Sequence, residues 1–325
     1  MRAVDGVSLS IDAGTSLGLV GESGCGKTTL ARSIIRVLPP NCEIVGGSVV
    51  FRGRDLVTMP ASELRRIRWK GIALVTQSAM NSLDPVQSIE DQLVEALRTH
   101  ESMSLRAARD RAKELCALVG VDPQRLRNYP HQMSGGMRQR AIIAMAMALR
   151  PALIIADEPT TALDVILQNQ VLMRFQQLQR DAGTSVLYIT HDVGVVTAMC
   201  EQVAIMYAGR IVETGRTEDV FTRPLHPYTQ GLIRAFPRLH GPRHHLLSIP
   251  GVPPIIRGDT TACRFEPRCP YADEACRQRE PDLEASEDSH RAACWFTSKV
   301  TGAAMQGKVE ERWLAFESSA NAEPA

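Results

Sequence analysis

Short apolar runs alternate with stretches of helical periodicity along most of the chain. Apolar runs of about four to eight residues without polar interruption are typical of strands that are buried on both faces of a sheet. Such runs predict strands at 16–20, 72–75, 153–156, 186–189 and 203–207. Helical periodicity predicts helices at 28–38, ended by Pro39-Pro40, and at 165–180. This alternation indicates an α/β fold in which helices cover a mostly parallel sheet.

Two regions interrupt the alternation. Between Ile89 and Leu149 no convincing strand occurs, and the periodicity predicts three helices at 89–98, 105–119 and 136–149. We therefore expect an inserted α-helical subdomain at about residues 86–149. After Pro224 proline becomes frequent and four cysteines fall close together, which predicts a small irregular C-terminal domain at 226–297. We expect residues 298–325, which are polar and rich in alanine, to form a loosely ordered tail.

Composition and charge narrow the class of protein. The 325 residues suffice for about two domains, and a content of 44% hydrophobic and 22% charged residues is typical of a globular chain. The formal net charge of +1 gives no general attraction for nucleic acid, and the basic run at 65–70 contains one aromatic residue, so no nucleic-acid partner is expected. The longest apolar run, 141–149, has about half the length of a membrane-spanning helix. No apolar signal segment begins the sequence, so the expected compartment is the cytosol.

A phosphate-binding loop is predicted directly after the first strand. Gly21-Glu22-Ser23-Gly24-Cys25-Gly26-Lys27-Thr28 fits the pattern GxxxxGK[ST] and precedes a predicted helix, which is the context that the motif requires. Glycines let the backbone N–H groups turn inward, and the helix N-terminus adds partial positive charge. We expect Lys27 to reach the β- and γ-phosphates of a nucleotide and Thr28 to bind Mg²⁺. The alternative is a glycine-rich turn with a surface lysine.

Two further motifs point to nucleotide chemistry. The strand at 153–156 is followed by Asp157 and Glu158, at the carboxyl end where ligands bind in open α/β sheets. Asp157 is the candidate for holding Mg²⁺ through water, and Glu158 is the candidate general base for the attacking water. Ser134-Gly135-Gly136 precedes a long helix and forms a second anion-binding corner, which suggests that two chains share nucleotides. Taken singly, these motifs also fit a solvated strand end and a simple helix cap.

The order of these motifs resembles that of the nucleotide-binding subunit of ATP-binding cassette (ABC) transporters over residues 7–225. Gln77 corresponds to the glutamine of the Q-loop, Ala162-Leu163-Asp164 to the D-loop and His191 to the switch histidine. The Ser134-Gly135-Gly136 segment corresponds to the signature motif. The resemblance implies a P-loop NTPase fold with an ABC-type RecA-like core at 1–225, and ATP and Mg²⁺ as cofactors. It also implies head-to-tail dimers, in which Ser134 and Gly136 of one chain close on ATP held by the other.

The resemblance assigns roles residue by residue. It implies catalytic roles for Glu158, His191 and Gln77. It implies nucleotide binding by Gly21, Ser23, Gly24, Cys25, Gly26, Lys27, Thr28, Thr29, Gln77, Ser134, Gly135, Gly136 and Asp157. It implies Mg²⁺ binding by Thr28, Gln77 and Asp157. Met133 and Met137 depart from the common signature LSGGQ, but the run SGGMRQR is similar to that of peptide-importer ATPases.

Three further fragments, at 77–85, 129–132 and 224–229, are similar to the oligopeptide/dipeptide/nickel importer family. The implied function is the ATPase subunit of a bacterial importer for peptides or related small solutes, bound peripherally at the cytoplasmic face of the inner membrane. The implied partners are two transmembrane permease subunits, a second ATPase subunit, identical or homologous, and an extracytoplasmic substrate-binding protein. ABC ATPases usually stack adenine on an aromatic residue before the phosphate loop, but no Phe, Trp or Tyr precedes Phe51. We expect either that this stacking is absent or that the natural chain starts further upstream.

Four cysteines form the pattern Cys263-x5-Cys269-x6-Cys276-x17-Cys294. Structural zinc sites usually separate paired ligands by about two to four residues, so the wider gaps weaken a zinc interpretation. Four thiolates and the Cys269-Pro270 step favour an iron–sulfur cluster. Importer extensions with a similar pattern are associated with a [4Fe–4S] cluster, which is therefore the expected group. Free or partly buried thiols are the second interpretation and zinc is the third.

Three other functions compete with transport. An ABC ATPase that acts on nucleic acid or the ribosome usually carries coiled-coil insertions or two cassettes, and neither is present in this sequence. An inactive scaffold subunit disagrees with intact Lys27, Asp157, Glu158 and His191. A small-molecule kinase leaves the Ser-Gly-Gly segment and His191 without a role.

Overall fold

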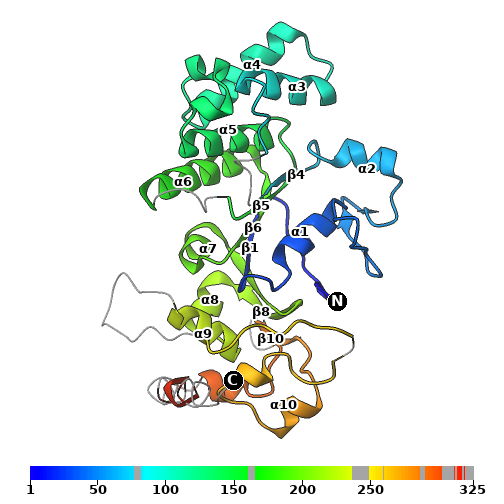
Figure 1. The fold of residues 1–325 in the computed structure, drawn as a ribbon, viewed down its shortest axis with the longest axis vertical. Coiled ribbons are helices and arrows are strands. Elements are labelled where there is room, and N and C mark those ends of the chain that lie inside the picture. The colour runs from blue at the N-terminus through cyan, green and yellow to red at the C-terminus, as the bar shows by residue number, and fades with distance from the viewer. Residues whose placement is uncertain are drawn as a thin grey trace. The chain divides into compact units, whose positions relative to one another are not determined.

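The chain divides into two compact units in the computed structural model, shown in Figure 1. The phosphate-loop unit comprises Met1–Leu9, Leu17–Leu30 and Thr190–Ala325, and the helical unit comprises Ser10–Ser16 and Ala31–Ile189. The structure describes residues 1–76, 82–159, 165–235, 249–258, 260–285, 290–301, 311, 313–316 and 318. The domain boundaries expected at 225 and 297 stay predictions.

The sheet of the phosphate-loop unit begins with two buried strands. Strand β1 (Ser16–Val20) pairs in parallel with β7 (Gln202–Tyr207), and β7 pairs antiparallel with β8 (Arg210–Arg216). Two short strands, β10 (Arg291–Ala292) and β9 (Glu284–Ala285), extend the sheet antiparallel beyond β8. All of β1, and β7 after its first residue, are buried, which explains why both strands are unbroken apolar runs in the sequence.

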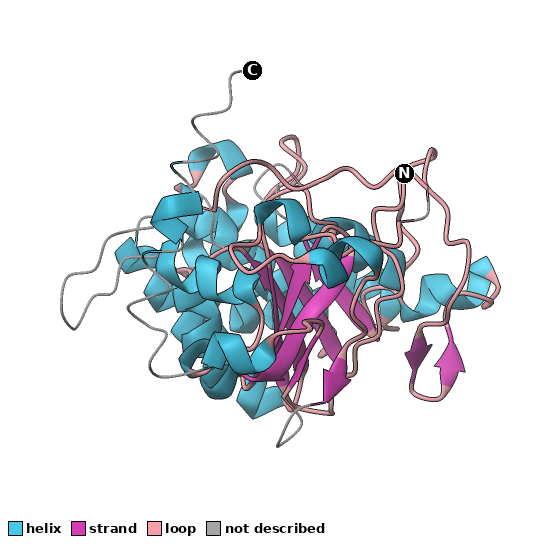
Figure 2. Ribbon diagram, turned by 90° about the horizontal axis from the view of Figure 1, so that it is seen from below, coloured by secondary structure: helices cyan, strands magenta, loops and turns pink. Residues whose placement is uncertain are grey.

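The helical unit contains three parallel strands, β4 (Ile72–Val75), β5 (Leu153–Asp157) and β6 (Ser185–Thr190). Helix α6 (Val165–Ala182) connects β5 to β6. Helices α3 (Ile89–His100), α4 (Leu105–Leu118) and α5 (Gly135–Met147) follow β4 and pack on one another, as expected for the helical insertion (Figure 1). Strands β2 (Val50–Phe51) and β3 (Arg54–Asp55) form a separate hairpin (Figure 2). The remaining elements of this unit are α2 (Ala61–Ile67) and the 3₁₀ helices η2 (Pro123–Arg127) and η3 (Pro130–Gln132).

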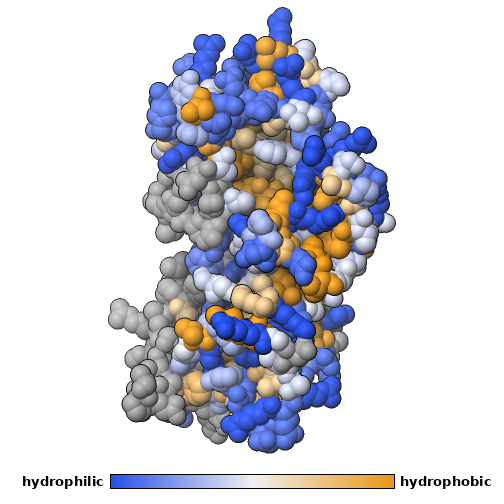
Figure 3. Space-filling model, turned by 45° about the vertical axis from the view of Figure 1, so that its right-hand side comes forward, coloured by the Kyte–Doolittle hydropathy of each residue, from blue (hydrophilic) through white to orange (hydrophobic). Residues whose placement is uncertain are grey.

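Serine caps set the starts of the three inserted helices. The side-chain oxygens of Ser88, Ser104 and Ser134 each accept a hydrogen bond from a backbone N–H group in the following turn. The outer surface around α3 and α4 is mostly hydrophilic (Figure 3), and its exposed large hydrophobic side chains include Leu105 and Leu118. Across the described ranges, no helix combines the length and the apolarity that crossing a membrane requires.

Helix α1 (Lys27–Ile34) is shorter than the sequence predicts. Arg36 has a φ of 53°, in the left-handed region, and the Val37 N–H group bonds to the Arg32 carbonyl oxygen at 2.9 Å. This pattern closes a helix end. The Arg36 guanidinium donates hydrogen bonds to the carbonyl oxygens of Met59 at 2.6 Å and Leu56 at 3.2 Å. These tertiary contacts hold Arg36 in its conformation, and the helix therefore stops before Pro39.

The later part of the phosphate-loop unit is built from short elements. These are α7 (Val193–Met199), α8 (Thr217–Thr222), α9 (Pro227–Ala235), η4 (Glu266–Arg268), α10 (Glu274–Gln278) and α11 (Thr297–Thr301). An aromatic cluster of Tyr207, Tyr228, Phe265 and Trp313 joins them to β7, and none of the four is more than 1% exposed. Ring centroids lie 4.7 Å apart for Tyr207 and Tyr228, and 6.4 Å apart for Phe265 and Trp313. This core is aromatic although only 5% of the chain is.

Glu213 on β8 is a fully buried carboxylate that ties this strand to distant segments. Its oxygens accept hydrogen bonds from the backbone N–H groups of Leu225 at 2.7 Å and His226 at 3.0 Å. Its Oε1 atom also lies 2.7 Å from His290 Nε2. A charged group is tolerated at this depth only because its oxygens are bonded. The sequence does not predict β8, because its apolar run is only Ile211-Val212 and the next buried residue is Glu213, whose burial depends on these distant partners.

We expect Glu213→Ala to lower the free energy of unfolding by about 3 kcal/mol, because two buried N–H groups lose their acceptor. Glu213→Gln retains one carbonyl oxygen as an acceptor and should lose about half as much. Urea denaturation followed by circular dichroism measures both values. An unchanged midpoint for Glu213→Ala would show that the buried carboxylate contributes nothing to stability.

His226 should make stability depend on pH. Burial lowers the pKa of His226 to about 3, whereas a histidine in an unfolded chain has a pKa of about 6.5. The neutral ring accepts a hydrogen bond at Nδ1 from the Tyr228 N–H group at 3.0 Å. Because the unfolded chain binds the proton more tightly, the contribution of His226 is fully present above about pH 6.5 and is lost as the pH falls toward 3.

The measurement is the melting temperature between about pH 7 and pH 4. His226→Asn supplies a non-titrating acceptor oxygen and should flatten the decline, whereas His131→Asn, at an exposed position, should not. Parallel pH profiles for the wild type and His226→Asn would rule out this explanation.

Candidate functional site

The phosphate loop joins β1 to α1 along a path that has no room for side chains at two of its glycines. A Cβ atom on Gly21 would lie 2.2 Å from the Met206 carbonyl oxygen of β7. A Cβ atom on Gly26 would lie 2.1 Å from the Ala3 carbonyl oxygen. Gly24 and Gly26 also have φ values of 82° and 108°, which side chains with a Cβ disfavour. The backbone path therefore requires the glycines of the motif.

Lys27 is the first residue of α1 and is only 6% exposed. Its ammonium group donates hydrogen bonds to the carbonyl oxygens of Gly21 at 2.7 Å and Glu22 at 2.9 Å. Neutral carbonyl acceptors leave the positive charge of this group available to an anion. Burial raises the pKa of the Cys25 thiol, and the ammonium of Lys27 only partly offsets this effect. Cys25 is therefore a buried thiol in this loop.

The end of β5 carries the two acidic residues that the sequence singles out. Asp157 is 2% exposed and Glu158 is 9% exposed. Glu158 has a φ of 49°, a left-handed conformation that costs a non-glycine residue about 1–3 kcal/mol. Its N–H group bonds to the Ile189 carbonyl oxygen of β6 at 2.8 Å, which helps to hold this conformation. Strained backbone of this kind is concentrated at functional sites.

The signature segment opens helix α5. The Ser134 side chain accepts a hydrogen bond from the Met137 N–H group at 3.4 Å, and Gly135 and Gly136 form the first turn. Ser134 is exposed, so the N-terminus of α5 is accessible. Further along the helix, the buried Gln139 amide donates a hydrogen bond to the Pro159 carbonyl oxygen. The signature helix is thus fixed to the residue that follows Glu158.

The predicted site residues are divided between the two units. The phosphate loop lies in the phosphate-loop unit together with His191, which is exposed directly after β6. The signature segment, Asp157 and Glu158 lie in the helical unit. The two groups of predicted site residues are therefore described separately, and their roles stay predictions. Gln77 and the D-loop residues 162–164 lie outside the described residues.

Two contacts with the phosphate loop were missed by the motif analysis. The Glu22 N–H group donates a hydrogen bond to the Tyr228 hydroxyl at 2.8 Å. The Glu22 carboxylate pairs with the Arg268 guanidinium at 2.6 Å. Tyr228 belongs to the fragment 224–229 that is similar to peptide importers, and Arg268 directly precedes Cys269 of the four-cysteine pattern. The sequence around both residues therefore indicated the family, but nothing in it indicated a contact with Glu22.

The iron–sulfur cluster expected at Cys263, Cys269, Cys276 and Cys294 is contradicted by the structure. All four cysteines are among the described residues, yet within this part of the chain no three His, Cys, Asp or Glu side chains are arranged to hold a metal ion. The cysteines remain thiols, not disulfides, and line one cavity of about 10 Å³ together with Phe265 and Trp295.

The surroundings of these thiols explain the correction. A cavity of this size holds about one water molecule. Burial raises the pKa of Cys263 to about 12 and raises the pKa of Cys269 and Cys276 as well. The four thiols pack around this small space beside Phe265 of the aromatic cluster, as small and weakly polar groups.

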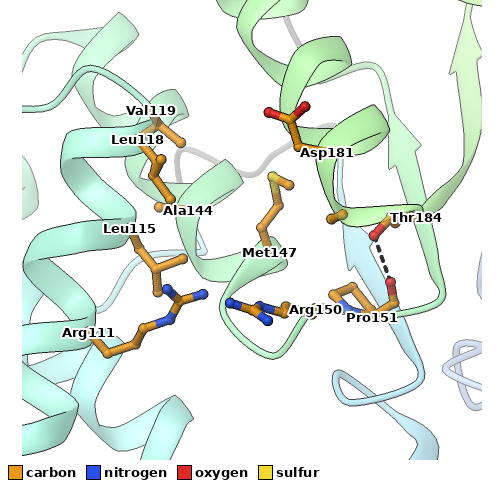
Figure 4. Close-up of a pocket in the computed structure, with 11 residues that line it drawn as sticks. Arg111, Leu115, Leu118, Val119, Ala144, Met147, Arg150, Pro151, Asp181 and Thr184 are labelled. Atoms are coloured by element: carbon orange, nitrogen blue, oxygen red, sulfur yellow. Dashed lines mark hydrogen bonds between the residues drawn. The ribbon is translucent and has the colours of Figure 1, made fainter.

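A larger hollow of about 340 Å³ lies in the helical unit, between α4, the end of α5 and the turn before β6 (Figure 4). Leu115, Leu118 and Met147 form an apolar part of its wall, and Arg111 and Arg150 line it from α4 and from the residues after α5. None of the predicted site residues lines this hollow. We therefore do not assign this hollow as the nucleotide site, although its volume is larger than that of the cavity beside the cysteines.

Comparisons with known proteins agree with the motifs. A family model described as ABC transporter matches residues 4–161, and one described as the C-terminal region of oligopeptide/dipeptide transporters matches residues 212–276. A probable peptide ABC transporter ATP-binding protein of Sinorhizobium fredii is 47% identical over 92% of this chain and 90% of its own length. The dipeptide transport ATP-binding protein DppD of Bacillus subtilis is 44% identical over 91% of this chain and 89% of its own length.

A solved structure agrees with the fold. The dimeric post-hydrolysis state of the ATP-binding cassette MJ0796, bound to ADP and Pi, is 28% identical and has a TM-score of 0.60 over 66% of this chain and 90% of that chain. The predicted P-loop NTPase fold is thus confirmed. The chain belongs to the ABC transporter family, as an ATP-hydrolysing, ATP-binding subunit that carries the C-terminal region of oligopeptide/dipeptide transporters.

Proposed function

We propose that this chain binds and hydrolyses MgATP to drive the import of peptides or related small solutes. The observation that carries nucleotide binding is the buried Lys27 ammonium, whose partners inside the phosphate loop are the neutral carbonyls of Gly21 and Glu22 and the thiol of Cys25. A phosphate group would offer this ammonium a charged acceptor in their place, which makes a stronger hydrogen bond. The relatives named for peptide and dipeptide transport support the substrate class.

Nucleotide binding is proposed for the whole loop and the first turn of α1. Inward N–H groups would bind the phosphates, and the helix N-terminus would favour their negative charge. The loop residues in this role are Gly21, Ser23, Gly24, Cys25, Gly26, Lys27, Thr28 and Thr29. Ser134, Gly135 and Gly136 would bind the nucleotide of a partner chain through the accessible N-terminus of α5.

The residues proposed for Mg²⁺ are chemically suitable. The Thr28 hydroxyl, the Asp157 carboxylate and the Gln77 amide offer the oxygen donors that Mg²⁺ prefers. Asp157 is buried, and a cation would stabilise its charge there. When bound, Mg²⁺ would neutralise charge on the phosphate oxygens.

Glu158 is proposed as the general base. Its carboxylate would accept a proton from the attacking water, and its backbone conformation would be held in advance by the bond to Ile189. His191 and Gln77 would orient the water and the γ-phosphate, as the family resemblance implies. Holding these groups in place lowers the barrier because less ordering is left for the reaction itself.

The proposed assembly is a head-to-tail dimer with membrane partners. The dimeric MJ0796 cassette supports the dimer, and the ABC transporter family match supports two transmembrane permease subunits. An extracytoplasmic substrate-binding protein would deliver the solute. The chain would bind at the cytoplasmic face of the cell membrane. A non-transport role on nucleic acid or the ribosome is not favoured, because the similar proteins are named for transport.

Glu158→Gln should lower kcat for ATP hydrolysis by a factor on the order of 10² to 10⁴, because the amide cannot accept the proton from water. ATP binding should persist, since Glu158 would act on the attacking water and the phosphates would be bound by the phosphate loop. A coupled ADP-release assay and a nucleotide titration measure the two effects. The matched control is Glu114→Gln on α4, at an exposed carboxylate outside all the motifs, which should hydrolyse ATP at the wild-type rate. Normal turnover by Glu158→Gln would remove this residue from the mechanism.

Peptide import can be tested in the source cell. Deletion of the gene should abolish uptake of a radiolabelled oligopeptide, and a plasmid copy should restore it. A copy with Lys27→Ala should fail to restore uptake, because the ammonium group that would bind the phosphates is removed. Unchanged peptide uptake in the deletion strain would exclude a peptide substrate of the type tested, whatever the ATPase activity of the purified chain.

A further inference from the structure

Arg268 links the C-terminal region to the phosphate loop through a buried ion pair. It ends the 3₁₀ helix η4, and its side chain is 5% exposed. Its guanidinium donates two hydrogen bonds to the Glu22 carboxylate, at 2.6 Å and 3.0 Å. Such a two-pronged pair is the strongest geometry for an arginine and a carboxylate. Both residues belong to the phosphate-loop unit.

The Arg268 guanidinium is itself held by the surrounding chain. Its nitrogen atoms donate to the carbonyl oxygens of Pro250 at 2.6 Å, Ile249 at 3.1 Å and Gly251 at 3.2 Å. It also donates to the Tyr207 hydroxyl at 3.3 Å. Because these contacts come from four residues of the same unit, the charge has a fixed position before any nucleotide arrives.

Glu22 is held at its backbone and at its side chain. Its N–H group bonds to the Tyr228 hydroxyl, its carbonyl oxygen accepts from Lys27 Nζ, and its carboxylate pairs with Arg268. Glu22 is the second residue of the phosphate loop. Tyr228 and Arg268 both come from the region after β8, so this region fixes the loop at two points.

The sign of the charge on Glu22 matters for the reaction. ATP brings several negative charges to the loop, and an uncompensated carboxylate on the loop would repel them. Arg268 neutralises that carboxylate from the side of the C-terminal region. A purely structural arginine would support folding but would not act through the charge of Glu22.

We propose that Arg268 is a positioning residue for ATP binding, which acts by neutralising the Glu22 carboxylate of the phosphate loop. This inference rests on the proposed role of residues 21–28 as the ATP site. It makes the C-terminal region part of the nucleotide site and not only a region that identifies the family. Nucleotide affinity should therefore respond to a residue that does not touch the nucleotide.

The first measurement is the dissociation constant of a fluorescent ATP analogue in the presence of Mg²⁺, with the full chain. Arg268→Ala should raise this constant about tenfold, because the Glu22 carboxylate is left uncompensated beside the phosphates. At saturating ATP, kcat should stay within about twofold of the wild type, because Arg268 affects binding and not the water. A wild-type dissociation constant for Arg268→Ala would overturn the proposal.

The second measurement separates charge from structure. In the double variant Glu22→Gln with Arg268→Ala, the repelling carboxylate is gone, and the dissociation constant should return to within about threefold of the wild type. A structural role for Arg268 predicts no such recovery, because both variants remove its bonds to Glu22. Failure of the double variant to bind better than Arg268→Ala would therefore also overturn the proposal.

Tyr271→Ala is the matched control. Tyr271 is equally buried, at 4% exposed, and lies in the same region, but its hydroxyl donates a hydrogen bond to Gln230 Oε1 at 3.3 Å. This variant should lower the melting temperature while the dissociation constant stays within about twofold of the wild type. Equal loss of ATP binding in Tyr271→Ala and Arg268→Ala would show general damage to the region and would overturn the proposal.

Two further variants keep the outcomes distinguishable. If Arg268→Ala does not fold, Arg268→Lys keeps the charge but loses the two-pronged bond, and it should bind ATP more weakly than the wild type by a few fold at most. Lys27→Ala tests the proposed function itself and should abolish binding. If Lys27→Ala binds ATP like the wild type, the ATP site is misassigned; if it fails to bind while Arg268→Ala binds normally, only the role of Arg268 is wrong.

Discussion

Close backbone contact around the phosphate loop is the constraint on which the rest of the phosphate-loop unit depends. The Met206 carbonyl oxygen occupies the space where Gly21 would carry a side chain, and the Ala3 carbonyl oxygen does the same at Gly26. The loop conformation is therefore set by β7 and by the N-terminal segment as much as by its own sequence. Whatever holds β7 in place also holds the loop. Two features fix β7 in place: the aromatic cluster around Tyr207 and the buried Glu213 on the neighbouring strand β8. Both involve residues that follow β7 in the chain.

The parts of the fold that could be predicted are those with a local signal. Strands β1 and β4 were predicted to the residue, because strands buried on both faces give unbroken apolar runs bounded by polar residues. The inserted helices began within one residue of their predicted starts, because Ser88, Ser104 and Ser134 supply the caps. The phosphate loop and the acidic end of β5 were likewise readable, since each is a contiguous motif next to a strand.

Features that depend on distant partners could not be predicted. Nothing near Glu22 indicates Arg268, because the two residues are 246 positions apart and meet only through the packing of the later region on β7. The Arg36 turn that shortens α1 depends on carbonyl groups of Leu56 and Met59. The four cysteines were misinterpreted for the same reason. Their spacing records how far apart they are in sequence, but it does not record the narrow apolar space in which their thiols are packed.

The hydrogen bond from Gln139 to Pro159 has a mechanical consequence. It ties helix α5, whose first turn carries Ser134, to the backbone beside Glu158 within the helical unit. If α5 shifted along its axis, this bond would have to break or Pro159 would have to follow the helix. One buried side-chain amide therefore makes the position of the signature segment and the backbone position of Glu158 depend on each other.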